Sequence, residues 1–331
     1  MSGRTRIGTV GAGSLGFHHI RLLRDMPDVD FVGFVETRPE RAAEVVAELN
    51  VAVLDSVEAL VERTDAITVV VPTPAHYEVA KVALAAGRHV LIEKPIAATL
   101  DEADELLATA SRTGAIVQTG HIERFNRAIR AALPHIDAPR FIESDRLAPF
   151  NPRGSDVAVV LDLMIHDIDL VFSLVGGHVS DLQAVGVPVL TPSVDIANAR
   201  LVFDSGAVAN ITSSRVSRER LRKIRIFQSS GYLSLDLAQG NGEFYRLRKD
   251  VDLAELAKAP LEMAAFVERV PLEAPEGEPL RLEFESFLAA VEGRQAVEVS
   301  GEAGREALAV ALRIVREIER GLPSLAGAHG R

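Results

Sequence analysis

Residues 6–16, RIGTVGAGSLG, constrain the fold of this chain more than any other stretch. A β-prone run is followed by Gly11, Gly13 and Gly16 in the order G-x-G-x-x-G, and the next residues have the apolar spacing of a helix. In such a strand-turn-helix unit, Gly11 permits the tight turn and Gly13 lets the backbone approach a pyrophosphate. Gly16 allows the helix to pack closely on the strand. The N–H groups at the helix start would then bind the pyrophosphate.

Glu36 ends a second β-prone run, residues 31–36, twenty residues past Gly16. A carboxylate here accepts hydrogen bonds from an adenosine ribose and repels a 2′-phosphate. The sequence therefore predicts a dinucleotide site that favours NAD over NADP. Arg38 and Arg41 stand close enough to receive a 2′-phosphate, although a solvated helix start is the favoured interpretation of both. The alternative for the whole motif is a glycine-rich turn in an unrelated α/β protein.

Composition limits the class of protein. A chain of 331 residues suits two domains, and no apolar run reaches the length of a membrane span. The absence of cysteine excludes disulfides and thiol nucleophiles. The net charge of −11, without a basic tract, argues against nucleic-acid binding. Because the first strand begins a few residues from Met1, we expect no signal peptide and a cytoplasmic location.

The first third of the chain alternates strand-like and helix-like segments. Strands are expected at 31–36, 51–54, 66–71, 88–93 and 115–120, in addition to the one before the glycine motif. Regular β-α alternation predicts a doubly wound parallel sheet, that is, an α/β Rossmann domain over residues 1–120. Ligands of such a domain bind beyond the carboxyl ends of the strands.

From about residue 121 the pattern changes to one long helix, residues 156–175, followed by β-rich segments. Turn sequences at 204–206 and 229–231 indicate hairpins. These patterns predict an α+β domain over residues 121–300 with an open, mostly antiparallel sheet. One face would lie on the long helix. The other, if apolar, would join copies into a homodimer or homotetramer. A last helix, residues 301–320, is expected to pack back on the first domain.

Lys94 is the first candidate for chemistry. It lies in the turn Glu93-Lys94-Pro95, at the same edge of the predicted sheet as the glycine motif. A lysine there can donate a hydrogen bond or a proton to a carbonyl or alkoxide oxygen. The alternative is an ordinary lysine at a strand end. The sequence leaves open whether the Lys94–Pro95 bond is cis or trans.

The long helix supplies the second candidate set. Asp162, His166 and Asp169 are spaced to share one face, and the other faces are apolar. A carboxylate beside a histidine orients the ring and raises its basicity, as a general base requires. A buried His–Asp pair with a purely structural role is the alternative. Asp167 points elsewhere and is interpreted as a surface or supporting acid.

Further contacts are expected around these two groups. On the cofactor side they are Ser14, Leu15, Arg38, Pro72, Thr73, His76, Glu93 and Lys94, although packing at a helix start is an equal interpretation of His76. On the substrate side they are His121, Arg124, Asn126 and Arg153, together with Asp162 and His166. No cluster has metal-ligand spacing and hydride transfer needs no metal, so we expect none.

In their order and spacing, GAGSLG, VPTPAHYEVAKVALAAGRHVLIEKP, GHIERFN and LDLMIHDIDL resemble the Gfo/Idh/MocA family of NAD(P)-dependent sugar and cyclitol oxidoreductases. The resemblance covers nearly the whole chain. It implies a Rossmann domain followed by an open-sheet domain used in oligomerisation. By this resemblance Lys94 matches the catalytic lysine of the family's E-K-P motif, and Asp162 and His166 match its catalytic D-x-x-x-H pair.

GHIERFN and LDLMIHDIDLV are most similar to the nucleotide-sugar branch, whose members oxidise a ring hydroxyl of a UDP-linked amino sugar such as UDP-N-acetylglucosamine. The resemblance implies that a hydroxyl lies between His166 and Lys94 and that its carbon gives a hydride to NAD. An inositol or free-sugar dehydrogenase of the same family is the first alternative. A non-catalytic NAD(H)-binding regulator and a redox-neutral enzyme that uses NAD transiently are the others.

Overall fold

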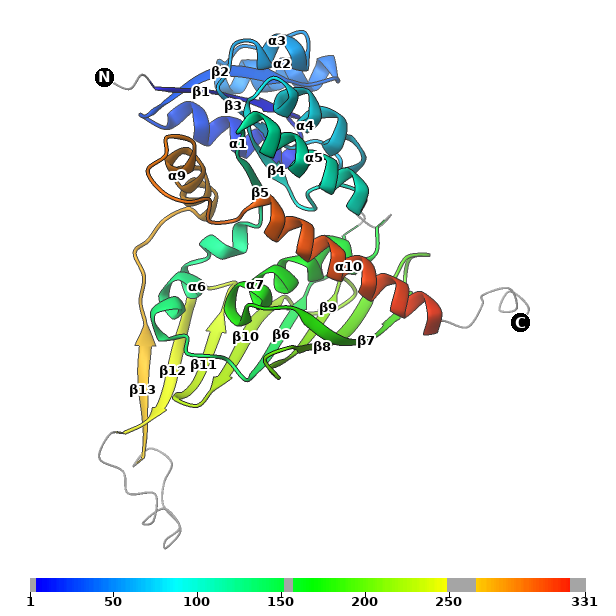
Figure 1. The fold of residues 1–331 in the computed structure, drawn as a ribbon, viewed down its shortest axis with the longest axis vertical. Coiled ribbons are helices and arrows are strands. Elements are labelled where there is room, and N and C mark those ends of the chain that lie inside the picture. Colours follow the sequence, from blue (N-terminus) through cyan, green and yellow to red (C-terminus); the bar gives the residue numbers. More distant parts are fainter. Residues whose placement is uncertain (1–3, 152–156, 249–265, 322–331) are drawn as a thin grey trace, which may run out of the picture. The chain divides into compact units, whose positions relative to one another are not determined.

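The computed structural model describes residues 4–151, 157–248 and 266–321 (Figure 1). The chain divides into two compact units. The first comprises Met1–Ile122 and Gly277–Ala309, and the second comprises Glu123–Glu276 and Val310–Arg331. No helix among the described residues is long and apolar enough to cross a membrane.

The first unit contains a parallel five-stranded sheet in the order β2-β1-β3-β4-β5. Its strands are β1 (Thr5–Val10), β2 (Val29–Val35), β3 (Ala66–Val69), β4 (His89–Glu93) and β5 (Val117–Gly120). Its helices are α1 (Ser14–Asp25), α2 (Pro39–Leu49), α3 (Val57–Val61), α4 (His76–Ala85), α5 (Leu100–Thr113) and α9 (Pro279–Val291), with the 3₁₀ turn η1 (Thr73–Ala75) before α4. This doubly wound architecture confirms the predicted Rossmann fold.

Helices cover both faces of this sheet, as buried parallel strands require. Successive side chains of β1 point to opposite faces of the sheet, so Ile7 and Gly8 show what packs on each face. Ile7 packs in a cluster with residues of α1 and α9. At Gly8, by contrast, an added Cβ would lie 2.5 Å from the Leu60 side chain of α3. Helix α5 begins with a capping box, in which the Thr99 side chain accepts from the Glu102 N–H and the Glu102 side chain accepts from the Thr99 N–H.

Two predictions for this unit are wrong. Residues 51–54 form no strand and contribute a single bridge between Val53 and Phe34. The segment is confined between the left-handed Asn50, at the end of α2, and Ser56, which caps α3. The predicted second domain also wrongly includes residues 277–300. They belong to the first unit because α9 buries apolar side chains against α1: Leu280, Phe284, Phe287 and Leu288.

The second unit contains an eight-stranded sheet in the order β13-β12-β11-β10-β6-β9-β8-β7. The strands are β6 (Phe141–Leu147), β7 (Val179–Val187), β8 (Ile196–Phe203), β9 (Val208–Ser214), β10 (Leu221–Gln228), β11 (Gly231–Asp236), β12 (Asn241–Leu247) and β13 (Val267–Leu272). All neighbours are antiparallel except β6 and β9, which confirms the mostly antiparallel sheet. Both predicted hairpins, β8–β9 and β10–β11, are present.

Helical segments lie on one face of this sheet (Figure 1). They are η2 (Ile122–Phe125), α6 (Arg127–Ala132), η3 (Leu133–His135), η4 (Val160–Met164) and α7 (Ile165–Val175). The helix predicted over 156–175 is therefore shorter and irregular. Residue 156 lies outside the described residues, and η4 is a π-helical turn that leads into α7. A π-helical turn is wider than an α-turn and is frequent at functional sites.

The opposite face of the sheet carries a row of stacked aromatic rings. Phe141, Phe227, Tyr232 and Tyr245 are cross-strand neighbours on four consecutive strands, with ring centroids 5.7, 5.3 and 4.8 Å apart along the row. The same face carries ion pairs such as Arg225–Glu143. The face is thus aromatic and charged, rather than uniformly apolar.

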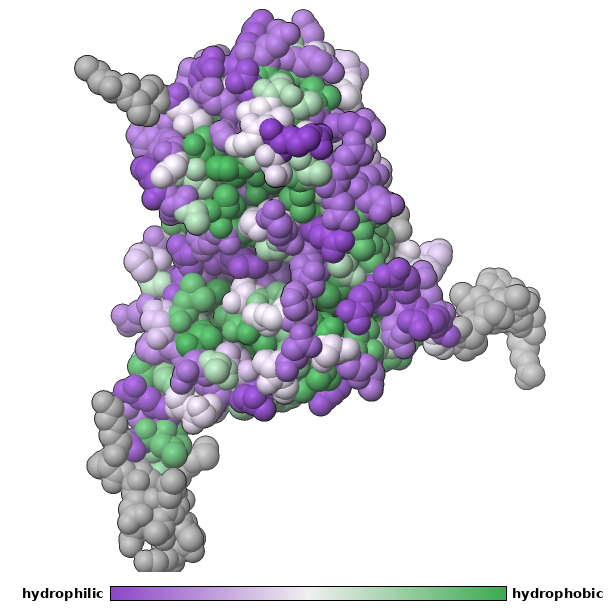
Figure 2. Space-filling model, viewed as in Figure 1, coloured by the Kyte–Doolittle hydropathy of each residue, from purple (hydrophilic) through white to green (hydrophobic). Residues whose placement is uncertain are grey.

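The last helix, α10 (Gly301–Gly321), contributes to both units. One face of this helix is a buried apolar stripe: Ala307, Ala311, Ile314 and Ile318 are at most 2% exposed. Figure 2 shows hydrophilic residues over its C-terminal part. At its start, α10 packs on the first unit, where Gly304 approaches Thr119. Further along, Ile318 approaches Gly186 of β7, in the second unit.

Candidate functional site

The glycine loop joins β1 to α1 with the geometry that a pyrophosphate requires. Gly11 has a φ of +95°, and a Cβ there would lie 2.4 Å from the carbonyl oxygen of Val70. A Cβ on Gly16 would lie 2.0 Å from the carbonyl oxygen of Gly11. A Cβ on Gly13 would meet nothing within 4 Å. Gly11 and Gly16 therefore serve the fold, whereas Gly13 borders open space that a ligand can fill.

The N-terminus of α1 is open to an anion. Gly13 is the N-cap and provides no side-chain hydrogen bond, and the first turn contains no acidic residue. Ser14 and Leu15, which follow it, are exposed. Because the first N–H groups of a helix lack intrahelical acceptors and carry the positive end of its dipole, this turn fits the pyrophosphate of NAD.

Glu36 lies at the carboxyl end of β2 and accepts hydrogen bonds from the N–H of Ala12 and from Arg38. Burial disfavours the charged carboxylate, but these hydrogen bonds outweigh it and lower the pKa of Glu36 to about 2. The contribution of the hydrogen bonds to stability is thus complete above the unfolded pKa and is lost as the pH falls towards 2. Glu36 is ionised at neutral pH, as an acceptor for ribose hydroxyls must be.

This arrangement makes a prediction about cofactor preference. Glu36→Ser removes the charge that repels a 2′-phosphate and releases Arg38, so we expect the NAD over NADP preference in binding to fall by about tenfold or more. Titration with both reduced cofactors measures it. Glu44→Ser is the matched control, because Glu44 pairs with Arg41 in the same helix. An unchanged preference in Glu36→Ser would contradict the role of Glu36.

His76 holds the loops on the cofactor side of the first unit. Its Nδ1 lies 2.8 Å from the carbonyl oxygen of Pro95 and its Nε2 lies 2.9 Å from that of Val71. The side chain is 1% exposed, and burial lowers the pKa of His76. The predicted cofactor contact is therefore wrong for His76, and its packing alternative is correct. Pro72 is exposed and Thr73 half-buried, and their cofactor contacts stay predictions.

Glu93 is the last residue of β4 and Lys94 follows it, but the two side chains have different surroundings. Glu93 is 8% exposed and its Oε1 lies 3.1 Å from Nε2 of the buried His19. Its carboxyl group also lies against Gly120, where a Cβ would be 2.9 Å away. Glu93 therefore supports the end of the strand through its contact with His19. Lys94 is half-buried, and the Lys94–Pro95 bond is cis.

In the second unit, Asp162 lies in the π-helical turn η4, and His166 lies at the start of α7. Both are partly exposed. Asp169, three residues past His166 in α7, is buried, and its two carboxylate oxygens each accept a 2.7 Å hydrogen bond from Arg124. Asp167 is 1% exposed, so of its two interpretations the surface acid is wrong and the supporting acid remains.

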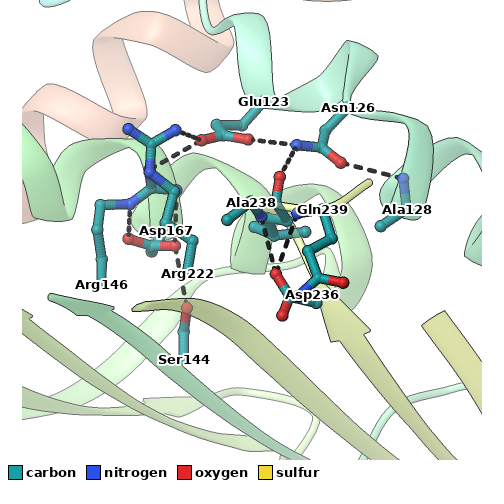
Figure 3. A network of polar contacts seen from close by, with 11 residues as sticks. Glu123, Asn126, Ala128, Ser144, Arg146, Asp167, Arg222, Asp236, Ala238 and Gln239 are labelled. Atoms are coloured by element: carbon teal, nitrogen blue, oxygen red, sulfur yellow. Dashed lines mark hydrogen bonds and ion pairs between the residues drawn. The ribbon is translucent and has the colours of Figure 1, made fainter. Parts of the chain in front are cut away.

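A buried polar network surrounds Asp167 (Figure 3). Arg146 of β6 binds Asp167 and Glu123, at 2.6 and 2.8 Å. Burial opposes the charge on Arg146, but these carboxylates outweigh it and raise the pKa of Arg146. Sequence reasoning did not connect these residues with one another, since nothing local links positions 123, 146 and 167.

Most of the side chains predicted to contact the substrate are instead buried or bound to other residues of the chain. Arg124 donates two hydrogen bonds to the carboxylate of Asp169. Asn126 caps α6 and donates to Glu123 and to the carbonyl oxygen of Leu237, so it is structural. His121 is also buried, and Arg153 lies outside the described residues. In the described parts of the chain, no group of three or more His, Cys, Asp or Glu residues is arranged to hold a metal ion.

Comparison with known proteins agrees with this geometry. Residues 5–121 match the family model described as "Oxidoreductase family, NAD-binding Rossmann fold", and residues 135–234 match the Gfo/Idh/MocA C-terminal domain. The chain is 37% identical to UDP-N-acetylglucosamine 3-dehydrogenase of Acidithiobacillus ferrooxidans, over 95% of this chain and 97% of that protein. The crystal structure of that enzyme superimposes with a TM-score of 0.87 and covers 96% of this chain and 98% of the other.

A second relative is more distant. Scyllo-inositol 2-dehydrogenase (NAD(+)) of Bacillus subtilis is 28% identical over 66% of this chain and 69% of its own length. The two family models and the full-length relative agree with the glycine loop and the two-unit fold. The chain belongs to the Gfo/Idh/MocA family of oxidoreductases, with an NAD-binding Rossmann domain.

Proposed function

We propose that this protein is an NAD-dependent dehydrogenase that oxidises the 3-hydroxyl of UDP-N-acetylglucosamine. The observation that carries the proposal is the full-length match to an enzyme of that name, at 37% identity and a TM-score of 0.87. The inositol dehydrogenase relative matches two thirds of the chain at lower identity. The substrate class follows the nearer resemblance.

We assign the chemistry to Lys94, Asp162 and His166. His166 accepts the proton of the sugar hydroxyl, and Asp162 orients the imidazole. Lys94 stabilises the negative charge that develops on the oxygen. The C–O bond becomes a carbonyl as the carbon loses its hydrogen with both electrons. When bound, NAD supplies the acceptor of that hydride. Gly13, the first turn of α1 and Glu36 would hold the NAD.

The test is NADH formation by the purified protein with a panel of substrates. UDP-N-acetylglucosamine is compared with N-acetylglucosamine, scyllo-inositol and myo-inositol, and the absorbance of NADH is followed. We expect NADH with the UDP-sugar alone. Signal with an inositol or a free sugar instead would favour the second candidate, an inositol or free-sugar dehydrogenase, which the relative from Bacillus subtilis supports. NADH binding without turnover on any substrate would favour a regulatory or redox-neutral role.

We also propose that a second copy of the chain covers the aromatic row, Phe141, Phe227, Tyr232 and Tyr245, to form a homodimer or a homotetramer. The four stacked rings are only half-buried, as expected of a surface with a partner. A cytoplasmic location, where NAD is available, completes the proposal.

The aromatic row makes a prediction about assembly. Tyr232→Asp places a carboxylate between two stacked rings, so we expect the protein to become monomeric. Molar mass by light scattering measures the change. Leu133→Asp is the control, because Leu133 is 44% exposed on η3, whose His135 packs on Phe244, a β12 residue that faces away from the aromatic row. An oligomer that persists in Tyr232→Asp would contradict this interface.

A further inference from the structure

Two buried ion pairs hold helix α7 on either side of His166. Asp167 accepts hydrogen bonds from Arg146, at 2.6 and 3.2 Å, and from Ser144 at 2.9 Å. Asp169 accepts two hydrogen bonds from Arg124, both at 2.7 Å. The side chains of both aspartates are at most 2% exposed. We call these two pairs the α7 clamp.

The clamp connects α7 to one short segment by two routes. Arg124 belongs to the turn η2 and binds Asp169 directly. Glu123 of the same turn binds Arg146, which in turn binds Asp167 (Figure 3). The other carboxylate oxygen of Glu123 accepts from Asn126, whose side chain also binds the carbonyl oxygen of Leu237. The η2 turn is thus also held by contacts that do not involve α7.

The two aspartates flank His166 around the helix. Successive residues of an α-helix are separated by about 100°. Asp167 therefore lies about 100° from His166 in one direction, and Asp169 about 60° in the other. A pair on each side resists rotation of the helix about its axis. Such restraint matters here because the preceding turn, η4, is π-helical, and its backbone pairing departs from that of a regular α-helix.

Energetics favours a positioning role over a purely stabilising one. Buried ion pairs add little net stability, because desolvation offsets most of their attraction, and apolar residues of similar volume often serve a core as well. Their distinctive property is fixed geometry, since a bidentate Arg–carboxylate pair has a preferred orientation. Two such pairs on the two sides of one histidine fix the direction of that histidine.

We propose that Arg124 and Arg146 are positioning residues for the reaction: through Asp169 and Asp167 they fix the rotation of α7 and thereby the direction of His166. This inference rests on the proposed role of His166 as the general base. Neither arginine needs to contact the substrate.

The first test separates positioning from stability. Asp169→Asn is expected to lower kcat by about 10- to 100-fold, because small displacements of a catalytic group have effects of that size, and to leave the KM for NAD unchanged. The variant Arg124→Met/Asp169→Leu removes both charges and should recover the melting temperature that Asp169→Asn loses. We expect its kcat to stay low. If kcat recovers together with the melting temperature, or if Asp169→Asn keeps wild-type kcat, the positioning role is overturned.

Asp104→Asn is the matched control. It breaks a bidentate pair with Arg305, at 2.7 and 3.0 Å, on the exposed surface of the first unit. We expect wild-type kcat from it, because this pair belongs to the first unit and includes no residue of α7 or of the α7 clamp. A loss of kcat as large as that of Asp169→Asn would show that breaking any such pair has this effect, which overturns the assignment to α7.

A second measurement is independent of turnover. Amide hydrogen exchange in residues 165–175 is expected to accelerate in Asp169→Asn and Arg146→Lys and to remain unchanged in Asp104→Asn. If the wild-type protein does not oxidise UDP-N-acetylglucosamine, the proposed function fails, but this measurement still tests the clamp. Unchanged exchange in both clamp variants would overturn it.

Discussion

His166→Ala is expected to slow the oxidation of UDP-N-acetylglucosamine by about 10²–10⁴-fold, the usual contribution of a general base. The hydroxyl proton then has no acceptor of suitable basicity as the hydride leaves. NADH binding should be unchanged, because the groups assigned to the cofactor belong to the first unit, whereas His166 belongs to the second. Steady-state rates and a fluorescence titration of NADH measure the two properties separately.

Lys94→Ala should also lower turnover strongly, because the charge that develops on the oxygen would lose its stabilising cation. His178→Ala is the control, since His178 is an exposed histidine that follows α7 in the same unit. Near-normal turnover in His166→Ala or in Lys94→Ala would refute the role assigned to that residue. A loss in His178→Ala of similar size would show that the assay reports folding rather than chemistry.

Gly13→Ala is expected to weaken NADH binding by roughly 10- to 100-fold while the protein stays folded. The added Cβ meets nothing within 4 Å in the protein, so it crowds a bound pyrophosphate rather than the chain. Crowding of this kind costs about 1–3 kcal/mol, which corresponds to that change in affinity. Calorimetric titration with NADH, together with a melting curve, measures both effects.

Gly16→Ala provides the contrast. Its Cβ would lie 2.0 Å from the carbonyl oxygen of Gly11, so helix and strand must separate. We expect it to lower both the melting temperature and the affinity for NADH. Wild-type NADH affinity in Gly13→Ala would contradict the placement of the pyrophosphate, whatever the behaviour of Gly16→Ala.

Structural features that depend on residues close together in the sequence could be predicted well. The glycine loop, the capping box at Thr99 and the two hairpin turns each depend on residues within a few positions of one another. The parallel sheet followed from the regular spacing of its apolar runs. Lys94, Asp162 and His166 stand out because their motifs are local, and their catalytic roles stay predictions.

Features that depend on distant partners could not be predicted. Helix α9 joins the first unit because its apolar side chains meet α1, more than 250 positions earlier. Asp167 and Asp169 bind arginines 21 and 45 positions away, so neither the helical spacing nor the charge pattern of residues 156–175 indicated their partners. His76 and Asn126 looked like ligand contacts, but their polar atoms bind neighbouring backbone and side chains.

The most direct test of the central claim follows the hydrogen that is transferred. The protein is incubated with NAD and UDP-N-acetylglucosamine that carries deuterium at C3, and the NADH formed is isolated for mass spectrometry. The proposed reaction predicts that the NADH contains the deuterium, because the hydride leaves the carbon whose hydroxyl is oxidised. NADH without deuterium would place the oxidation at another carbon. The absence of NADH from this substrate, with turnover on an inositol, would contradict the proposed function.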